Sequence, residues 1–244
     1  MPYHLATPQK ITSVILSIIP AGAKRAILKL MIRSQIENSE LLHAQMALVL
    51  AIILQVILDK SLVVGPKYLI GGLELLLVIA IGLSPPHKPS RTSHIRRIFS
   101  FVLIALISVA NATSMALVAG DLINGTSIPG KTLIASAGAI FLTNIIIFSL
   151  WYWELDSPAL TGLRQHDAAP KFDFPQMESV LSENKNWEPG YSDYLYLSTT
   201  NASAFSPTDT MPLTHGAKFL MALQALISLV AVVLVTARAV NILG

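Results

Sequence analysis

Five long apolar stretches limit this chain to folds in which several helices cross a lipid bilayer. A helix needs about 20 apolar residues to span a hydrocarbon core of about 30 Å. The stretches that approach this length lie at residues 41–58, 68–83, 98–119, 132–153 and 217–242. The sequence therefore predicts an all-α integral membrane protein with about five transmembrane helices.

Composition supports this prediction and excludes several kinds of site. Only 13% of the residues are charged, whereas soluble domains carry about 25%. Cysteine is absent, and no two of the six histidines have the spacing of metal ligands. The chain has no P-loop, dinucleotide-binding glycine pattern or nucleophile elbow. We therefore expect no enzyme activity, no bound metal and no cofactor.

Charge divides the chain into two parts. Residues 154–209 carry nine acids and three bases, a net charge of −6, and the rest carries fourteen bases and five acids, a net charge of +9. A basic surplus spread over apolar helices suits anionic lipid head groups better than nucleic acid. The expected partners are the lipid bilayer and a protein that docks on the acidic loop.

The N-terminal arm, residues 1–40, differs from the five spans. Its isoleucines recur at helical spacing before Pro20 and Gly22 interrupt them, and basic residues follow. A broken basic amphipathic pattern is typical of a helix that lies on the membrane surface. We expect an interfacial helix here, and a sixth span at residues 10–33 is the alternative.

The rest of the chain divides into two predicted regions. Residues 41–130 form a three-helix membrane region. Residues 131–244 form a hairpin that holds an acidic loop, 154–190, and a re-entrant loop, 191–214. Trp151, Tyr152 and Trp153 are expected to anchor the fourth span in the membrane interface, with Glu154 and Asp156 just outside in water.

The segment 191–214 is polar although it lies between two apolar spans. Ser192 or Asp193 is expected to cap a short helix, and Pro207 prevents that helix from continuing. An extended polar strand, beginning near Thr199, and a turn at Thr208 and Asp209 follow. A span, a short helix, a polar strand and a second span together form a pore-loop layout, whose irregular backbone needs burial or a water-filled cavity.

The sequence STTNASAFSPTDTMPLT within this segment resembles the pore helix and filter of potassium channels. Asp209, Pro212 and Thr214 match the Asp, Pro and Thr of that family, and residues 217–243 resemble its inner helix. The resemblance covers residues 151–243 and implies a tetramer of identical chains. The whole chain also resembles an uncharacterised family of bacterial multi-pass membrane proteins, which implies a plasma membrane location.

The filter itself departs from the potassium-channel pattern. Residues 204–208, AFSPT, stand where that family has Thr-Val-Gly-Tyr-Gly, and without the glycines a stack of carbonyl rings is disfavoured. Polar side chains would give weak selectivity instead. A closed plug whose polar groups satisfy one another is the alternative. The pore-like or filter-like residues are Thr199, Thr200, Asn201, Ser203, Ala204, Phe205, Ser206, Pro207, Thr208 and Asp209.

The short connections bear on orientation. Basic residues are most numerous in the N-terminal arm and in residues 84–97, so the positive-inside rule places both in the cytoplasm. Five spans then place the acidic loop in the cytoplasm too, whereas potassium channels hold that loop outside. Three alternatives to a simple five-span arrangement remain. They are a sixth span, an external N-terminus, and an inverted pore loop such as that of ionotropic glutamate receptors.

Three intramembrane polar residues complete the candidate sites. Glu74 is either a proton carrier or a structural carboxyl beside Gly71 and Gly72. Asn111 and Asn144, like Gln55 and Gln224 within other spans, are expected to form hydrogen bonds between helices.

These features support three functions. The first is a weakly selective, oligomeric pore-loop ion channel. The second is a non-conducting scaffold or assembly subunit of a larger complex. The third is a small transporter that uses Glu74 to carry protons.

Overall fold

The computed structural model describes residues 40, 42–58, 62–63, 71–72, 75, 79, 91–124, 129–156, 169–177, 187–204 and 209–243. Three predictions lie outside these residues: the interfacial helix of the N-terminal arm, the role of Glu74 and the conformation of residues 205–208. Most of the predicted second span also lies outside, although Gly71, Gly72, Leu75 and Ile79 are helical.

Helices dominate the described part of the chain, as the sequence predicts. A first helix covers Leu42–Ile57. The elements that follow are α4 (Arg91–Asn124), α5 (Gly130–Asp156), β1 (Phe172–Asp173), the 3-10 helix η2 (Pro175–Met177), α6 (Tyr191–Ala204), β2 (Met211–Pro212) and α7 (His215–Leu243). The two short strands pair antiparallel, with Phe172 opposite Pro212 and Asp173 opposite Met211.

Three of these helices contain segments long and apolar enough to cross a membrane. The segments are Ile98–Asp121 in α4, Gly130–Asp156 in α5 and His215–Thr236 in α7, and their mean hydropathies are 2.2, 2.1 and 2.5. They coincide with the third, fourth and fifth predicted spans. The helix Leu42–Ile57 is apolar but shorter. The described helices therefore fit a membrane protein.

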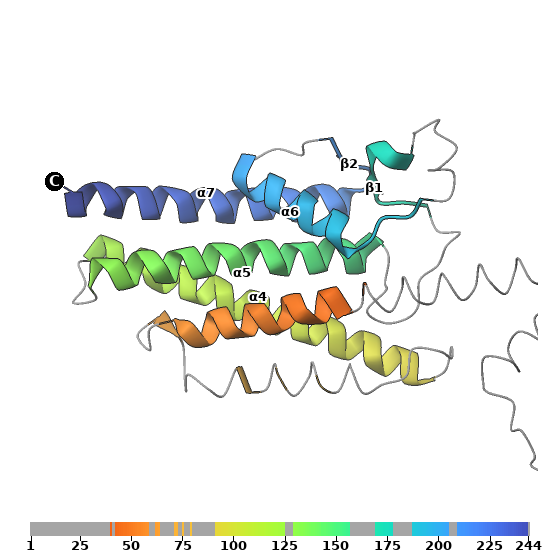
Figure 1. Ribbon diagram of the computed structural model, residues 1–244, viewed down its shortest axis with the longest axis horizontal. Helices are drawn as coiled ribbons and strands as arrows, with labels where there is room; N and C mark the ends of the chain where they lie inside the picture. The colour runs from red at the N-terminus through yellow and green to blue at the C-terminus, as the bar shows by residue number, and fades with distance from the viewer. Residues whose placement is uncertain are drawn as a thin grey trace, which may run out of the picture. The chain divides into compact units, whose positions relative to one another are not determined.

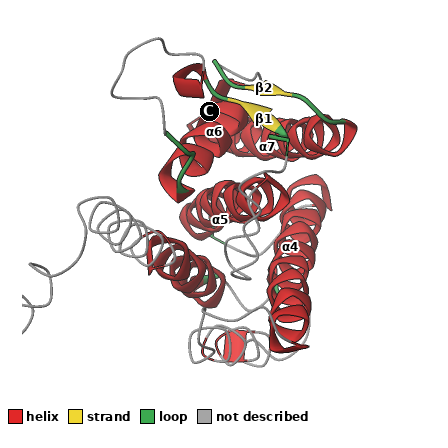
Figure 2. Cartoon of the chain, turned by 90° about the vertical axis from the view of Figure 1, so that its right-hand side faces the viewer, coloured by secondary structure: helices red, strands yellow, loops and turns green. Residues whose placement is uncertain are grey.

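Helix α5 lies at the centre of the described bundle. In its most apolar stretch 72% of the residues are buried, against 39% for α4 and 22% for α7. Figures 1 and 2 show α4 and the helix Leu42–Ile57 on one side of α5 and α6 and α7 on the other. Helices α4, α6 and α7 each pack directly on α5.

Polar side chains join the helices within this bundle. Asn144 of α5 donates a hydrogen bond to Ser228 Oγ of α7 at 3.1 Å, and Gln55 donates one to the carbonyl oxygen of Ile107 at 3.3 Å. Both bonds confirm the expected helix-joining role of these amides. Asn111 is buried in α4, and its Oδ1 accepts no hydrogen bond from any described residue.

The segment 169–177 folds back onto the end of α5. Lys171 donates a backbone hydrogen bond to Asp156 Oδ1 at 2.5 Å, and its Nζ donates to the carbonyl oxygen of Leu155 at 2.6 Å. The carbonyl oxygen of Lys171 in turn accepts a bond from Leu213 N at 2.9 Å, next to β2. Residues 169–177 and the β1–β2 ladder thus form a cap over the ends of α5 and α7.

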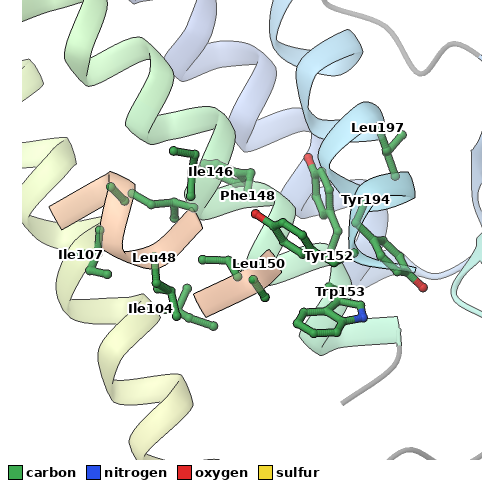
Figure 3. Close-up of a cluster of buried hydrophobic side chains, with 14 of the residues drawn as sticks. Leu48, Ile104, Ile107, Ile146, Phe148, Leu150, Tyr152, Trp153, Tyr194 and Leu197 are labelled. Carbon is green, nitrogen blue, oxygen red and sulfur yellow. The ribbon is translucent and has the colours of Figure 1, made fainter. Parts of the chain in front are cut away.

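Aromatic rings pack this cap onto the helices. The Phe172 ring centroid is 5.3 Å from that of Tyr152 and 6.2 Å from that of Tyr194, and the Phe174 ring is 5.4 Å from Tyr194. Figure 3 shows Tyr152 and Trp153 of α5 in the cluster, with Leu48 and Ile104 on one side and Tyr194 on the other.

The cap overturns the prediction for the end of the fourth span. Tyr152 and Trp153 are fully buried in protein, and Glu154, expected in water, is only 2% exposed. Asp156 is half-buried and accepts a hydrogen bond from the Tyr194 hydroxyl at 2.6 Å. Segments distant in sequence pack on this end of α5: Phe172 lies against Tyr152, Lys171 bonds to Asp156, and Tyr191 lies against Trp153. The local hydropathy pattern shows none of these contacts.

We expect Phe172→Ala to lower the free energy of unfolding by about 3 kcal/mol, because it leaves a cavity among packed rings. Thermal unfolding of the detergent-solubilised protein would measure this. The matched control is Phe99→Ala in α4, where the side chain is 41% exposed and little packing is lost. Equal losses of stability in the two variants would contradict the role given to the cap.

Candidate functional site

Helix α6 begins with a local hydrogen-bonded cap. The Asp193 carboxylate accepts a hydrogen bond from Gly190 N at 2.7 Å, and Asp193 N donates to the Gly190 carbonyl oxygen at 3.1 Å. The first bond is one half of a capping box, in which the side chain of the third helical residue accepts from the N-cap N–H. The N-cap is Gly190, which has no side chain to form the other half. The sequence offered Ser192 or Asp193 as the N-cap, but the helix begins at Tyr191, so that position was wrong. Asp193 takes part in the cap from within the first turn instead.

Helix α6 has one buried face and one exposed face. The buried residues are Tyr191, Tyr194, Leu197, Ser198, Asn201 and Ala202. Their spacing of three or four residues matches one side of a helix, and that side packs on α5 and α7 (Figure 1). The exposed face carries Ser192, Tyr196, Thr199 and Ser203.

Four polar side chains join α6 to both long helices at this contact. Gln224 Nε2, on α7, donates to Ser198 Oγ at 2.7 Å and to the Ser198 carbonyl oxygen at 3.0 Å. Gln224 Oε1 accepts from Tyr152 OH at 2.5 Å and from Asn201 Nδ2 at 2.9 Å. We call Tyr152, Ser198, Asn201 and Gln224 the polar junction.

Backbone carbonyl groups complete the polar junction. Ser198 Oγ donates to the carbonyl oxygen of Ile145 in α5 at 2.7 Å, and Asn201 Nδ2 donates to that of Met221 in α7 at 3.0 Å. All four side chains of the junction are buried. Because a buried amide or hydroxyl without a partner costs about 1–3 kcal/mol, these bonds strongly favour this one position of α6.

A second contact holds the start of α6. Tyr191 OH and Ser149 Oγ lie 2.9 Å apart, and Ser149 Oγ also donates to the Ile146 carbonyl oxygen at 2.7 Å. The Tyr191 ring meets the Trp153 ring edge to face at a centroid distance of 5.4 Å. Helix α6 is therefore attached to α5 along most of its length.

The polar junction lies well inside the helical hairpin. Ile145 precedes the end of α5 at Asp156 by roughly 16 Å along the helix axis, at 1.5 Å per residue. Gln224 follows the start of α7 at His215 by roughly 14 Å on the same basis. Helix α6 thus runs from the cap back along the two long helices.

The structure corrects the predicted conformation of the pore-like segment. Helix α6 continues through Ala204, so Thr199, Thr200, Asn201 and Ser203 are helical and the predicted extended strand is wrong there. Asn201 is buried in the polar junction, where it lines no opening. The strand prediction rested on the modest intrinsic helix propensity of Ser, Thr and Asn. It failed because tertiary hydrogen bonds stabilise the helix here.

Three hydroxyl groups in the second half of α6 are bonded to their own helix. Thr199 Oγ1 donates to the Leu195 carbonyl oxygen at 2.7 Å, and Ser203 Oγ donates to that of Thr199 at 2.8 Å. Thr200 Oγ1 makes the same kind of bond to Tyr196 at 3.0 Å. Asp209, the last filter-like residue, is exposed in a bend before β2.

Sequence reasoning found part of this site. It identified Gln224 as a residue that joins helices, and the structure confirms this. It missed Ser198, which looked like one more hydroxyl in a polar run, and it assigned Tyr152 to the membrane interface. No fixed spacing relates these residues, because they lie on three different helices.

The polar junction joins three helices through buried hydrogen bonds. No group of His, Asp and Glu side chains in the described ranges has the arrangement of a metal site. Comparisons with protein-family models, curated proteins and solved structures find no match to this chain.

The polar junction should dominate the stability of the hairpin. Gln224→Leu leaves Tyr152, Ser198 and Asn201 without their shared buried partner, so we expect a loss of about 3 kcal/mol in unfolding free energy. Thermal unfolding in detergent measures it. Gln176→Leu is the matched control at an exposed position in η2 and should change stability by less than about 0.5 kcal/mol. An unchanged melting temperature in Gln224→Leu would refute the role of the junction.

The cap of α6 should respond to pH. Burial raises the pKa of Asp193 above its usual 3.8, and the hydrogen bond from Gly190 N offsets only part of this rise. The protonated carboxyl group is therefore favoured in the folded state, so the contribution of Asp193 to stability falls as pH rises above 3.8 through the higher folded-state pKa.

The test compares Asp193→Asn with the unchanged protein. The Asn side chain keeps an oxygen for Gly190 N but does not titrate. We expect the melting temperature of the variant, relative to the unchanged protein, to rise between about pH 4 and about pH 7. A difference independent of pH would show that the carboxyl group is not perturbed.

Proposed function

We propose that this chain is one subunit of a weakly selective, pore-loop cation channel in the bacterial plasma membrane. In this proposal the chain has five spans, and α6 is a re-entrant helix between the fourth span, α5, and the fifth span, α7. The observation that supports it best is the position of the polar junction, which attaches α6 to α5 and α7 well inside the hairpin.

Bilayer dimensions support the re-entrant assignment. If α5 and α7 cross a hydrocarbon core of about 30 Å, a junction roughly 14–16 Å from their ends lies far below the membrane surface. After α6 the chain has only residues 205–210 in which to return to β2 at the cap. Such a segment between two spans needs a water-filled cavity or protein around it.

The direction of α6 favours cations. Its C-terminal end at Ala204 leads into the filter-like segment, and its last turn contains no basic residue. A helix C-terminus carries a partial negative charge that stabilises nearby cations. The hydroxyl groups of Ser206 and Thr208 and the acid Asp209 follow in the sequence, so partial and full negative charges meet at the proposed constriction.

A pore of this kind requires several copies of the chain. One filter-like segment lines only one side of a passage, and the exposed face of α6 carries Tyr196, Thr199 and Ser203. Polar side chains at membrane depth face protein or water, so that face is directed to other copies or to the pore. A homo-tetramer follows from the resemblance to potassium channels.

A scaffold or assembly subunit is the second candidate. The hydroxyl groups of Thr199, Thr200 and Ser203 are already bonded within α6, as they would be in a closed plug. The acidic loop would then dock a protein partner. This candidate requires no flux through the protein.

Flux through proteoliposomes tests the channel. We expect Ser203→Leu and Ser206→Leu each to lower cation flux by about tenfold or more, because a bulky apolar side chain narrows and dehydrates the passage. Ser192→Leu is the matched control on the same exposed side of α6 but beside the cap, and its flux should be unchanged. Absence of flux in the unchanged protein would favour the scaffold, and equal flux in all three variants would exclude the proposed constriction.

The absence of native cysteine makes orientation measurable. In the proposed five-span arrangement with a cytoplasmic N-terminus, single cysteines at Ser90 and Asp167 lie on the same side of the membrane. Labelling of Ser90→Cys and Asp167→Cys from opposite sides would exclude that arrangement.

A further inference from the structure

A pocket of about 320 Å³ lies between the first helix, Leu42–Ile57, and α4. Apolar side chains form most of its described lining. Three polar residues interrupt this lining: Gln55 of the first helix and Thr113 and Ser114 of α4. A mostly apolar cavity with a few polar groups is the usual form of a small-molecule site.

The pocket lies near the middle of the apolar segment of α4. That segment, Ile98–Asp121, has 24 residues and is roughly 36 Å long at 1.5 Å per residue. The α4 residues that line the pocket, from Leu106 to Ser114, follow Ile98 by roughly 12–24 Å on the same basis. Where α4 crosses a bilayer, this depth is that of the hydrocarbon core.

The pocket opens on the outer surface of the helices. Val109 lines it and is 66% exposed, and Ala110 beside it is half-buried. Elsewhere the lining is tight, since a Cβ at Gly71 would lie 3.2 Å from Val56 Cγ2. A molecule dissolved in the lipid therefore reaches the pocket directly, past Val109.

The polar groups of the lining are buried and held in position. Gln55 and Ser114 are 9% and 5% exposed. Gln55 Nε2 donates to the carbonyl oxygen of Ile107, which fixes the first helix to α4 at this level, and the Thr113 hydroxyl donates to that of Val109. Amide and hydroxyl groups that face a purely hydrocarbon ligand are unfavourable. An oxygen-bearing ligand therefore suits this lining better than an acyl chain does.

The lining also disfavours a charged ligand. None of the described residues around the pocket is charged. An ionised group at this depth, without a partner of opposite charge, is costly to bury. The head group of a phospholipid is therefore a poor occupant.

We propose that this pocket binds the head of a neutral, lipid-soluble carbonyl compound of the quinone type. The ring lies among the apolar side chains, and a ring carbonyl oxygen accepts a hydrogen bond from Gln55 or Ser114. The tail leaves past Val109 into the lipid. The volume lies near the lower end of the range for ligand sites, about 300–1,000 Å³, so the pocket holds one ring and leaves the tail outside.

Native mass spectrometry of the full chain in detergent, titrated with decylbenzoquinone, tests this site. We expect decylbenzene, which has the same tail and no carbonyl group, to bind about fivefold more weakly. We expect a similar loss of decylbenzoquinone affinity in Gln55→Met, which removes the amide but keeps a side chain of similar length.

A second variant leaves the Gln55 bond to Ile107 in place. Ala110→Phe puts a ring into the cavity, so we expect at least about tenfold weaker binding of decylbenzoquinone. The matched control is Ala112→Phe, the same change at an exposed position of α4 that is not part of the lining. It should bind as the unchanged protein does.

Three outcomes would overturn the proposal. The first is equal binding by Ala110→Phe and Ala112→Phe. The second is equal affinity for decylbenzene, which would make the pocket a site for apolar chains. The third is displacement of decylbenzoquinone by phosphatidylglycerol at the same concentration, which would assign the pocket to ordinary lipid. None of these results depends on ion flux, so the site and the proposed channel stand or fall separately.

Discussion

The hydrogen bonds of Gln224 are the constraint on which the rest of the hairpin depends. This one side chain donates to Ser198 and accepts from Tyr152 and Asn201, so a single amide on α7 is joined to both α5 and α6. Apolar packing alone would let a short helix slide or rotate along two long ones, because it has no direction. Buried amides and hydroxyls are directional and costly to leave unpaired, and they fix one depth and one rotation of α6.

The position of α6 in turn determines how the chain closes at the cap. With Tyr194 facing the cap, its hydroxyl group reaches Asp156 and its ring meets Phe172 and Phe174. Those contacts place β1 where it can pair with β2 just before α7 begins. The polar junction and the aromatic cap are thus two ends of one arrangement around α5, which explains why that helix is the most buried of the three apolar spans.

The sequence predicts the positions of the long helices, which depend on local hydropathy, and misses the features that depend on tertiary contacts. The apolar runs predicted the ends of α4, α5 and α7 to within a few residues, except for the start of α4. That helix begins earlier, at Arg91, because its first residues are polar and basic and so give no hydropathy signal. The strand expected from Thr199 onward and the exposed position expected for Glu154 were both wrong. In each case segments far away in sequence decide the outcome: α7 bonds Asn201 into a helix, and residues 169–177 and α6 pack on the end of α5. The ladder between Phe172 and Pro212 could not be foreseen for the same reason.

Tyr152 belongs to both ends of this arrangement. Its hydroxyl group bonds to Gln224 in the polar junction, while its ring packs against Phe172 in the cap. A change of size at position 172 therefore alters the reach of the hydroxyl toward position 224. Among related chains we expect correlated substitutions at positions 152, 172 and 224.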